Sequence, residues 1–403
     1  MSLHVKEKAF MSKKYSTVIA SFVIMLCIGS VYAWSLVASQ LMGKYDFSAF
    51  ESQLVFGFII AIFPVTMIFV GQLGKRMGHR YFGYICGLLF AFGYWIAGSS
   101  DGNFFMILLG VGIFSGVGTG FGYWVSLTSP LQWFPERKGL IAGIAAAGFG
   151  LGAVFMSELL EILLSRGFGI LELLKIIGVA YGVVIVVFST LIFQAQSQEG
   201  EDVAHIKLSA FIGSKIFKKL CVGIFLGTFA GLLIIGSLGI IANQHGIPSG
   251  IVAIGVALFA VANFMGRLLW GVFSDYFGAD LSIFLALLFQ SIAILALNLF
   301  ALTHLLYLAI AACIGFGFGG NFVLFARETA QLYGVENLGI VYPYVFLGYA
   351  IAGIAGPMSG GYLYDVFGSF FYAILLASFM SFMGGLLFLQ TGKAFKAQKS
   401  ARK

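Results

Sequence analysis

The chain has 403 residues, of which 60% are hydrophobic and 10% are charged, with 54 glycines and 44 phenylalanines. Soluble domains carry about 25% charged residues, so this composition excludes an ordinary water-soluble protein. The formal net charge of +7 would suit a nucleic-acid-binding protein. The basic residues are distributed by membrane side rather than gathered in one patch, which argues against that class.

Long apolar segments follow one another along the whole chain. Each has about 20 residues, which is enough to cross about 30 Å of hydrocarbon as a helix. We expect twelve membrane spans, at 16–38, 52–72, 81–99, 103–128, 138–164, 171–195, 217–243, 249–273, 280–300, 303–326, 338–361 and 367–391. A polar connector at 196–216 divides them into bundles at 16–195 and 217–391, with short tails at 1–15 and 392–403. The sequence therefore predicts an all-α membrane protein of two six-helix bundles.

Two sequence patterns recur at an offset of 200 residues. The segment Gly71-Gln72-Leu73-Gly74-Lys75-Arg76-Met77-Gly78 corresponds to Gly271-Val272-Phe273-Ser274-Asp275-Tyr276-Phe277-Gly278, and Trp133, Glu136 and Gly139 correspond to Tyr333, Glu336 and Gly339. Two patterns that agree at one offset indicate an internal duplication of about half the chain. Because duplicated halves of membrane proteins enclose a central substrate path, we expect two pseudo-symmetric bundles with a site between them.

The basic residues divide unevenly between the two membrane sides. With twelve spans, both termini and every second loop share one side, and this side receives all lysines and arginines except Lys44, Arg166, Lys175 and Arg267. Such an excess marks the cytoplasmic side. We therefore expect an integral protein of the plasma membrane, monomeric in the lipid bilayer, with both termini in the cytoplasm. The basic segment 393–403 completes the same signal, and we expect no nucleic-acid partner.

Arg267 is the first candidate for binding a substrate. It lies in the eighth predicted span, eight residues before Asp275, which marks the cytoplasmic end of that helix. Arg267 is thus about 12 Å deeper in the membrane, where an arginine costs about 2.5–3.5 kcal/mol. No carboxylate is expected at that depth, so the guanidinium is suited to gripping a substrate carboxylate with two parallel hydrogen bonds. The alternative is that Arg267 extends to the cytoplasmic surface or bonds to backbone carbonyls.

Three further polar residues are candidates for the same site. Asn263 lies one turn before Arg267 on the same helix face, although an asparagine in a span also commonly joins two helices. Tyr123 follows a glycine-rich stretch in the fourth span and would offer its hydroxyl to an anion, although tyrosine is also common at membrane surfaces. Tyr32 in the first span is a candidate of the same kind.

Two glycine-rich loops on the cytoplasmic side are predicted to act as gates between the halves. The residues concerned are Gly71, Arg76 and Gly78 in the first loop and Gly271, Asp275 and Gly278 in the second. Their glycines permit tight turns, and their charges can bind helix ends or the facing half. The alternative is a plain tight turn with basic charge, and it applies more to the first loop because Lys75 stands where an acid is expected.

The sequence contains no motif for an enzyme or a cofactor. It lacks a phosphate-binding loop, a metal-binding cluster and a nucleophile triad, and its four cysteines lie singly in apolar runs. We expect no cofactor and no metal. No acid stands near the centre of a span as a proton relay, and Arg327 and Glu328 are expected at the membrane interface.

The twelve spans and the paired loops resemble the major facilitator superfamily of transporters, whose loops have the form Gly-x-Leu-x-Asp-Arg-x-Gly-Arg. A narrower resemblance is to the oxalate/formate antiporter family and its bacterial monocarboxylate-transporter homologues. The segments that carry it are Tyr32-Ala33-Trp34-Ser35, the glycine-rich span that ends in Tyr123, Trp133-Phe134-Pro135-Glu136-Arg137-Lys138-Gly139 and Gly266-Arg267-x-x-Trp270-Gly271-x-x-Ser274-Asp275. The resemblance covers nearly the whole chain.

This resemblance implies roles for particular residues. In that family the arginine matching Arg267 binds the substrate carboxylate, the asparagine matching Asn263 assists in monocarboxylate members, and the tyrosine matching Tyr123 lines the site. The oxalate carriers have a lysine in the eleventh span, whereas this chain has no Lys or Arg between 338 and 391, and Tyr349 stands near the place of that lysine. Phe325 stands where these relatives often have a tyrosine.

One cation suits one carboxylate, so we expect a secondary carrier of a small monocarboxylate such as lactate, pyruvate or formate. The two halves would rock about Arg267 in alternating access. Proton-coupled transport and anion exchange both remain open. The alternatives are an oxalate/formate-type dicarboxylate exchanger, a carrier of another organic anion or other solute, and a non-transporting membrane sensor.

Overall fold

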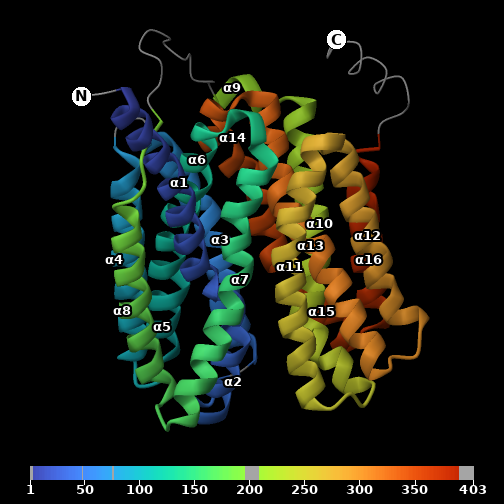
Figure 1. The fold of residues 1–403 in the computed structure, drawn as a ribbon. Coiled ribbons are helices and arrows are strands. Elements are labelled where there is room, and N and C mark those ends of the chain that lie inside the picture. The colour runs from blue at the N-terminus through green and yellow to red at the C-terminus, as the bar shows by residue number, and fades with distance from the viewer. Residues whose placement is uncertain (1–2, 48, 75–76, 196–207, 390–403) are drawn as a thin grey trace.

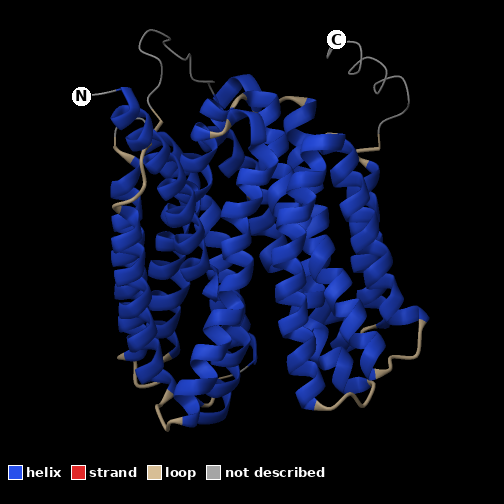
Figure 2. Ribbon diagram, in the orientation of Figure 1, coloured by secondary structure: helices blue, strands red, loops and turns tan. Residues whose placement is uncertain are grey.

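The computed structural model describes residues 3–47, 49–74, 77–195 and 208–389, and every regular element in these ranges is helical (Figure 2). A backbone surrounded by hydrocarbon has to satisfy its polar groups within one segment, which favours helices for such apolar runs. Both ends of the described chain lie on one side of the molecule, which we call the terminal side (Figure 1).

The N-terminal half supplies six apolar segments. The first consists of α1 (Leu3–Ile28), the 3₁₀-helix η1 (Gly29–Ala33) and α2 (Trp34–Tyr45), and the next two are α3 (Ala49–Leu73) and α4 (His79–Gly98). The fourth consists of α5 (Phe104–Ile107), the π-helix η2 (Leu108–Ser115) and α6 (Gly116–Trp133). A 3₁₀ turn, η3 (Pro135–Arg137), leads to α7 (Lys138–Ser165) and α8 (Ile170–Ser189).

The C-terminal half repeats this plan. The short helix α9 (Leu208–Phe211) precedes α10 (Lys215–Gln244), α11 (Ser249–Phe277), α12 (Ala279–Leu299) and α13 (His304–Tyr333). The last two segments are the pair α14 (Val335–Val345) and α15 (Leu347–Phe367), followed by α16 (Phe371–Leu386).

The predicted all-α membrane fold is confirmed. Eleven helices in the described residues are long and apolar enough to cross a membrane, and α16 is a shorter apolar helix of 16 residues. Together they occupy the twelve predicted positions. Two details differ from prediction: α1 already begins at Leu3 within the predicted tail, and the predicted connector contains α9. The rest of that connector, at 196–207, and the predicted tail at 392–403 lie outside the described residues.

The eleventh segment is divided at Phe346, shortly after a proline inside α14. Pro343 has no backbone N–H, so the carbonyl oxygen of Gly339, four residues earlier, loses its normal helical donor. This carbonyl is therefore available to a donor from another part of the molecule.

The two halves meet through helices that the duplication relates. Helix α7 packs against α11 and α13, while α3 packs against α14 and α15. Glycines of the two repeated patterns meet across the halves: Gly271 lies against Gly139, and Gly71 lies against Gly339. A Cβ atom on Gly271 would lie 2.5 Å from the carbonyl oxygen of Gly139, and one on Gly71 would clash with the carbonyl oxygen of Gly339. Glycine is required at both places because the backbones approach too closely for a side chain.

Candidate functional site

Arg267 lies on α11 where that helix packs against the N-terminal half, and 0% of its surface is exposed. Its Nη1 donates to the carbonyl oxygen of Ala146 on α7 at 2.6 Å, and its Nε donates to Oδ1 of Asn263 at 3.0 Å. The third nitrogen, Nη2, has no hydrogen-bond partner among the described residues. The side chain therefore does not extend to the surface. It bonds to one backbone carbonyl, as the alternative expects, but keeps a buried charged donor unsatisfied.

Two phenylalanine rings enclose the guanidinium of Arg267. Its central carbon lies 4.1 Å from the ring centre of Phe322 on α13 and 5.6 Å from that of Phe149 on α7. Such cation–π contacts contribute about 2 kcal/mol when water is excluded. Arg267 forms no ion pair with the carboxylates of the described residues. The rings hold the guanidinium in place, while its positive charge remains available to an anion.

Tyr123 on α6 supplies a second unsatisfied donor. The residue is 0% exposed, and its hydroxyl has no hydrogen-bond partner among the described residues. Its ring centre lies 5.4 Å from that of Phe149, the ring that also contacts Arg267, and 5.3 Å from that of Phe346. A buried polar group without a partner costs about 1–3 kcal/mol. An anionic oxygen that accepts from the Tyr123 hydroxyl would remove this cost.

Tyr32 and Tyr349 connect the halves beside this cluster. Their hydroxyl oxygens are 2.9 Å apart, which joins η1 to α15. The Tyr32 ring centre lies 5.4 Å from that of Phe149, and the Tyr349 ring centre lies 5.2 Å from that of Phe322. Both tyrosines therefore border the rings that enclose Arg267, and their hydroxyls are already engaged with each other.

The structure does not bring Phe325 to this place. Its ring packs against Phe388, with centres 5.5 Å apart, and against Gly223 on α10, within the C-terminal half. Sequence reasoning did not find Phe149 and Phe322, the rings that enclose the guanidinium. With 44 phenylalanines in the chain, their residue type gave no signal. Only the position of Phe149 between two glycines, Gly148 and Gly150, marked a place where helices approach closely.

Asp275 forms a contact between the halves on the terminal side. Its Oδ1 accepts from the N–H of Gly139 and its Oδ2 from the N–H of Leu140, both at 3.0 Å, at the start of α7. A carboxylate at a helix N-terminus satisfies N–H groups that lack helical partners. Arg327 donates to Asp275 at 3.4 Å, and Arg327 and its neighbour Glu328 are 7% and 6% exposed.

The loop glycines have different roles. Gly278 adopts a φ of 87° between α11 and α12, which favours glycine, whereas Gly78 directly precedes α4 at an ordinary φ of −64°. Arg76 and Lys75 lie outside the described residues. In the N-terminal half, Gly71 of α3 and Trp124 of α6 make the equivalent contact with α14.

Trp124 forms that second contact between the halves. Its Nε1 donates at 2.8 Å to the carbonyl oxygen of Gly339, the oxygen that Pro343 leaves without a helical donor. The indole is held by His79 and Phe82, with ring centres at 5.0 and 5.5 Å. The terminal side is thus closed by a carboxylate in one half-to-half contact and by an indole in the other.

We expect the substitution Trp124→Phe to weaken the contact between α6 of the N-terminal half and α14 of the C-terminal half. The phenyl ring keeps apolar packing but leaves the buried Gly339 carbonyl unsatisfied, which costs about 1–3 kcal/mol and shifts the closed population about 5- to 150-fold. Electron paramagnetic resonance distances between spin labels at Leu73 and Glu336 measure the shift. Trp95→Phe, which changes an exposed tryptophan, is the control. An unchanged distance distribution in Trp124→Phe would contradict this role.

The comparisons with known proteins agree with this architecture. The sequence profile of the Major Facilitator Superfamily matches residues 17–342 and 220–403. The chain belongs to this family. It is 27% identical to the MFS-type transporter YhjX of Escherichia coli (strain K12) over 85% of this chain and 86% of that protein. It is 25% identical to the oxalate:formate antiporter of Oxalobacter formigenes over 89% and 88%.

Among solved structures, the fold is similar to that of the major facilitator superfamily transporter FucP of E. coli. The TM-score is 0.68 at 17% identity, covering 93% of this chain and 100% of that chain. As a major facilitator superfamily member, the chain is a membrane transporter of a small solute and not an enzyme. The family places solute sites between its two halves, where Arg267 and Tyr123 lie.

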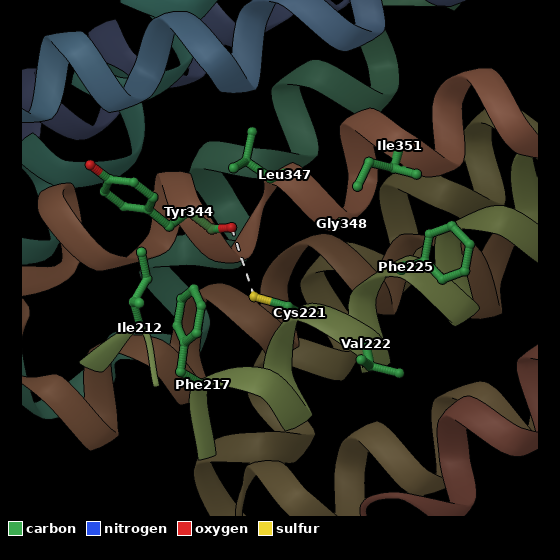
Figure 3. A pocket seen from close by; sticks show the side chains of 9 residues that line it. All are labelled: Ile212, Phe217, Cys221, Val222, Phe225, Tyr344, Leu347, Gly348 and Ile351. Carbon is green, nitrogen blue, oxygen red and sulfur yellow. Dashed lines mark hydrogen bonds between the residues drawn. The ribbon is translucent and has the colours of Figure 1, made fainter. Parts of the chain in front are cut away.

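A cavity of about 350 Å³ lies elsewhere in this transporter, between α10 and the α14–α15 pair (Figure 3). We call it the α10–α15 groove. It includes Phe217, Val222 and Phe225 of α10 and Leu347 and Ile351 of α15. Its lining is apolar, and it does not include Arg267, Asn263, Tyr123, Tyr32 or Tyr349.

Proposed function

We propose that this transporter carries a small monocarboxylate and that Arg267 binds the carboxylate. The observation that carries the proposal is a fully buried guanidinium with an unsatisfied Nη2, beside the unsatisfied Tyr123 hydroxyl. Both groups donate hydrogen bonds, so the partner that satisfies them has to accept. A carboxylate has two oxygens that accept from such groups and a charge that balances Arg267.

Several features support a substrate with one carboxylate and a short apolar body. Among the described residues, Arg267 is the one cation beside Tyr123, Phe149 and Phe322. Tyr349, which stands near the position of the lysine in the oxalate carriers, carries no positive charge. The rings of Phe149 and Phe322 face the guanidinium and offer apolar walls. Asn263 holds Nε of Arg267 and thereby fixes the direction in which the remaining donors point.

Alternating access explains how such a buried site is reached. Arg267 and Tyr123 are 0% exposed, so a substrate reaches them only after the halves move apart. The contacts of Asp275 and Trp124 hold the terminal side closed. Their release opens the pathway to the site from the terminal side. The excess of lysine and arginine on the terminal side supports a plasma-membrane protein with both termini in the cytoplasm.

A dicarboxylate exchanger is the second candidate function. The oxalate:formate antiporter of Oxalobacter formigenes, a relative over most of the chain, favours it by its name. The absence of any lysine or arginine at 338–391 weighs against it, since a second carboxylate would lack a cation from this segment. Transport measurements separate the two candidates.

Uptake of radiolabelled L-lactate into proteoliposomes tests the proposal. We expect saturable uptake that an inward proton gradient accelerates, or that lactate on the inner side accelerates if the carrier is an exchanger. Vesicles loaded with oxalate serve as the exchange control. Acceleration of uptake by oxalate alone would establish the dicarboxylate exchanger instead. The absence of lactate, pyruvate and formate flux in all these vesicles would contradict a monocarboxylate carrier.

A further inference from the structure

The α10–α15 groove opens on the outer surface of the C-terminal half. Val222 is 47% exposed and Ile351 is 60% exposed, so both rims face away from the bundle. The thiol of Cys221 donates to the carbonyl oxygen of Tyr344 at 3.8 Å and offers little polarity to an occupant (Figure 3). An occupant of this groove is therefore apolar where it contacts the protein.

The position of the groove along α10 matches one leaflet of a bilayer. Helix α10 begins at Lys215 on the terminal side, and the groove residues on it run from Phe217 to Phe225. At 1.5 Å per residue these positions lie about 3 to about 15 Å from the start of the helix. Half of a hydrocarbon core of about 30 Å has the same depth. The groove thus lies at the level of the acyl chains of the leaflet on the terminal side.

Two lysines lie at the mouth of the groove. Lys215 and Lys218 are exposed, and Lys218 shares a helix face with Val222, four residues later. Neither lysine forms an ion pair within the described part of the chain. Lys219 differs, because its Nζ is 2.9 Å from Oδ1 of Asp280. Two uncompensated positive charges therefore border an apolar groove at the membrane surface.

We propose that the α10–α15 groove binds an anionic phospholipid, with one acyl chain in the groove and the phosphate beside Lys215 and Lys218. Apolar lining alone would accept any lipid, and the two lysines supply the preference for negative charge. From the attraction that one surface lysine exerts on anionic lipid, two lysines give about 30-fold preference over a zwitterionic lipid. The occupant would also contact Tyr344, whose hydroxyl accepts from Gln72 of the other half at 3.3 Å.

Photo-crosslinking in vesicles tests this site with the full-length protein. The photoreactive amino acid p-benzoylphenylalanine replaces Val222. The vesicles contain phosphatidylglycerol and phosphatidylcholine in equal amounts, and one of the two lipids is radiolabelled in each experiment. We expect about 30-fold more labelling by phosphatidylglycerol. The double substitution Lys215→Ala and Lys218→Ala should reduce this ratio to about 1. The matched control, Lys13→Ala with Lys14→Ala, removes equal charge from the same side of the molecule and should leave the ratio unchanged.

Two outcomes would contradict a phospholipid site in the α10–α15 groove. Equal labelling by both lipids would mean that the groove contacts only the general lipid surroundings. A preference that survives the loss of Lys215 and Lys218, or that falls equally in the control, would assign it to the overall charge of the protein. Monodisperse elution and an unchanged thermal unfolding temperature show that the variants are folded. The result does not depend on lactate transport, so the site and the proposed substrate stand or fall separately.

Discussion

Replacing Arg267 with lysine or glutamine is expected to lower monocarboxylate uptake at least 100-fold. Glutamine removes the charge, and lysine keeps the charge but loses the planar fork that contacts Ala146 and Asn263 and would bind the proposed carboxylate. Loss of a desolvated charged hydrogen bond costs about 3–5 kcal/mol, which corresponds to 100-fold and more. Initial rates of radiolabelled lactate uptake in proteoliposomes measure the effect.

A matched substitution separates this role from a general effect of charge. Arg166 is exposed at the end of α7, and Arg166→Gln should transport at the rate of the unchanged protein. Membrane insertion of both Arg267 variants should remain close to that of the parent, since lipid-facing surfaces are unaltered. Uptake at the parental rate in Arg267→Lys and Arg267→Gln would remove Arg267 from the substrate site.

Gly271→Val is expected to hold the terminal side open and to reduce transport at least tenfold. A Cβ atom at this position would lie 2.5 Å from the Gly139 carbonyl oxygen and 3.2 Å from Cγ2 of Val323. Backbone atoms cannot yield as a flexible side chain does, so α7 and α11 have to separate. A cycle that needs closure at each turnover then slows, because closure costs about 1.4 kcal/mol more for each tenfold loss of the closed state.

Spin labels at Arg137 and Tyr276, both exposed, report this separation. Their distance distribution should shift to longer values in Gly271→Val. The control is Gly361→Val on α15, where no atom lies within 4 Å of an added Cβ, and it should leave distances and rate unchanged. A parental distance distribution in Gly271→Val, together with parental uptake, would show that the close contact at Gly139 is not needed for the transport cycle.

Of the two contacts on the terminal side, the sequence predicted one and not the other. Asp275 in its glycine-rich loop was recognisable as a candidate gate, and its carboxylate caps α7. Trp124 gave no such signal, because its partner, the Gly339 carbonyl, lies 215 residues away and becomes available through Pro343. A proline predicts a carbonyl without a helical donor, but only the packing of the halves decides which donor reaches it.

The membrane-spanning segments and the depth of Arg267 follow from the sequence by itself. Span length is set by the thickness of hydrocarbon, and depth along a helix is set by a fixed rise per residue. The duplication also indicated two related halves, and the repeated glycines meet across them, Gly71 against Gly339 and Gly139 against Gly271. These properties are local or repeat along the chain, so they can be read without knowing which helices touch.

The surroundings of Arg267 were decided only by the tertiary structure. In a membrane helix the lipid-facing and bundle-facing residues are both apolar, so the sequence does not show which face turns inward. This is why Phe149 and Phe322 enclose the guanidinium without having been predicted, while Phe325 packs against Phe388 instead. Hydropathy fixes how deep a residue lies, whereas the rotation of its helix and the approach of the other half fix what it touches.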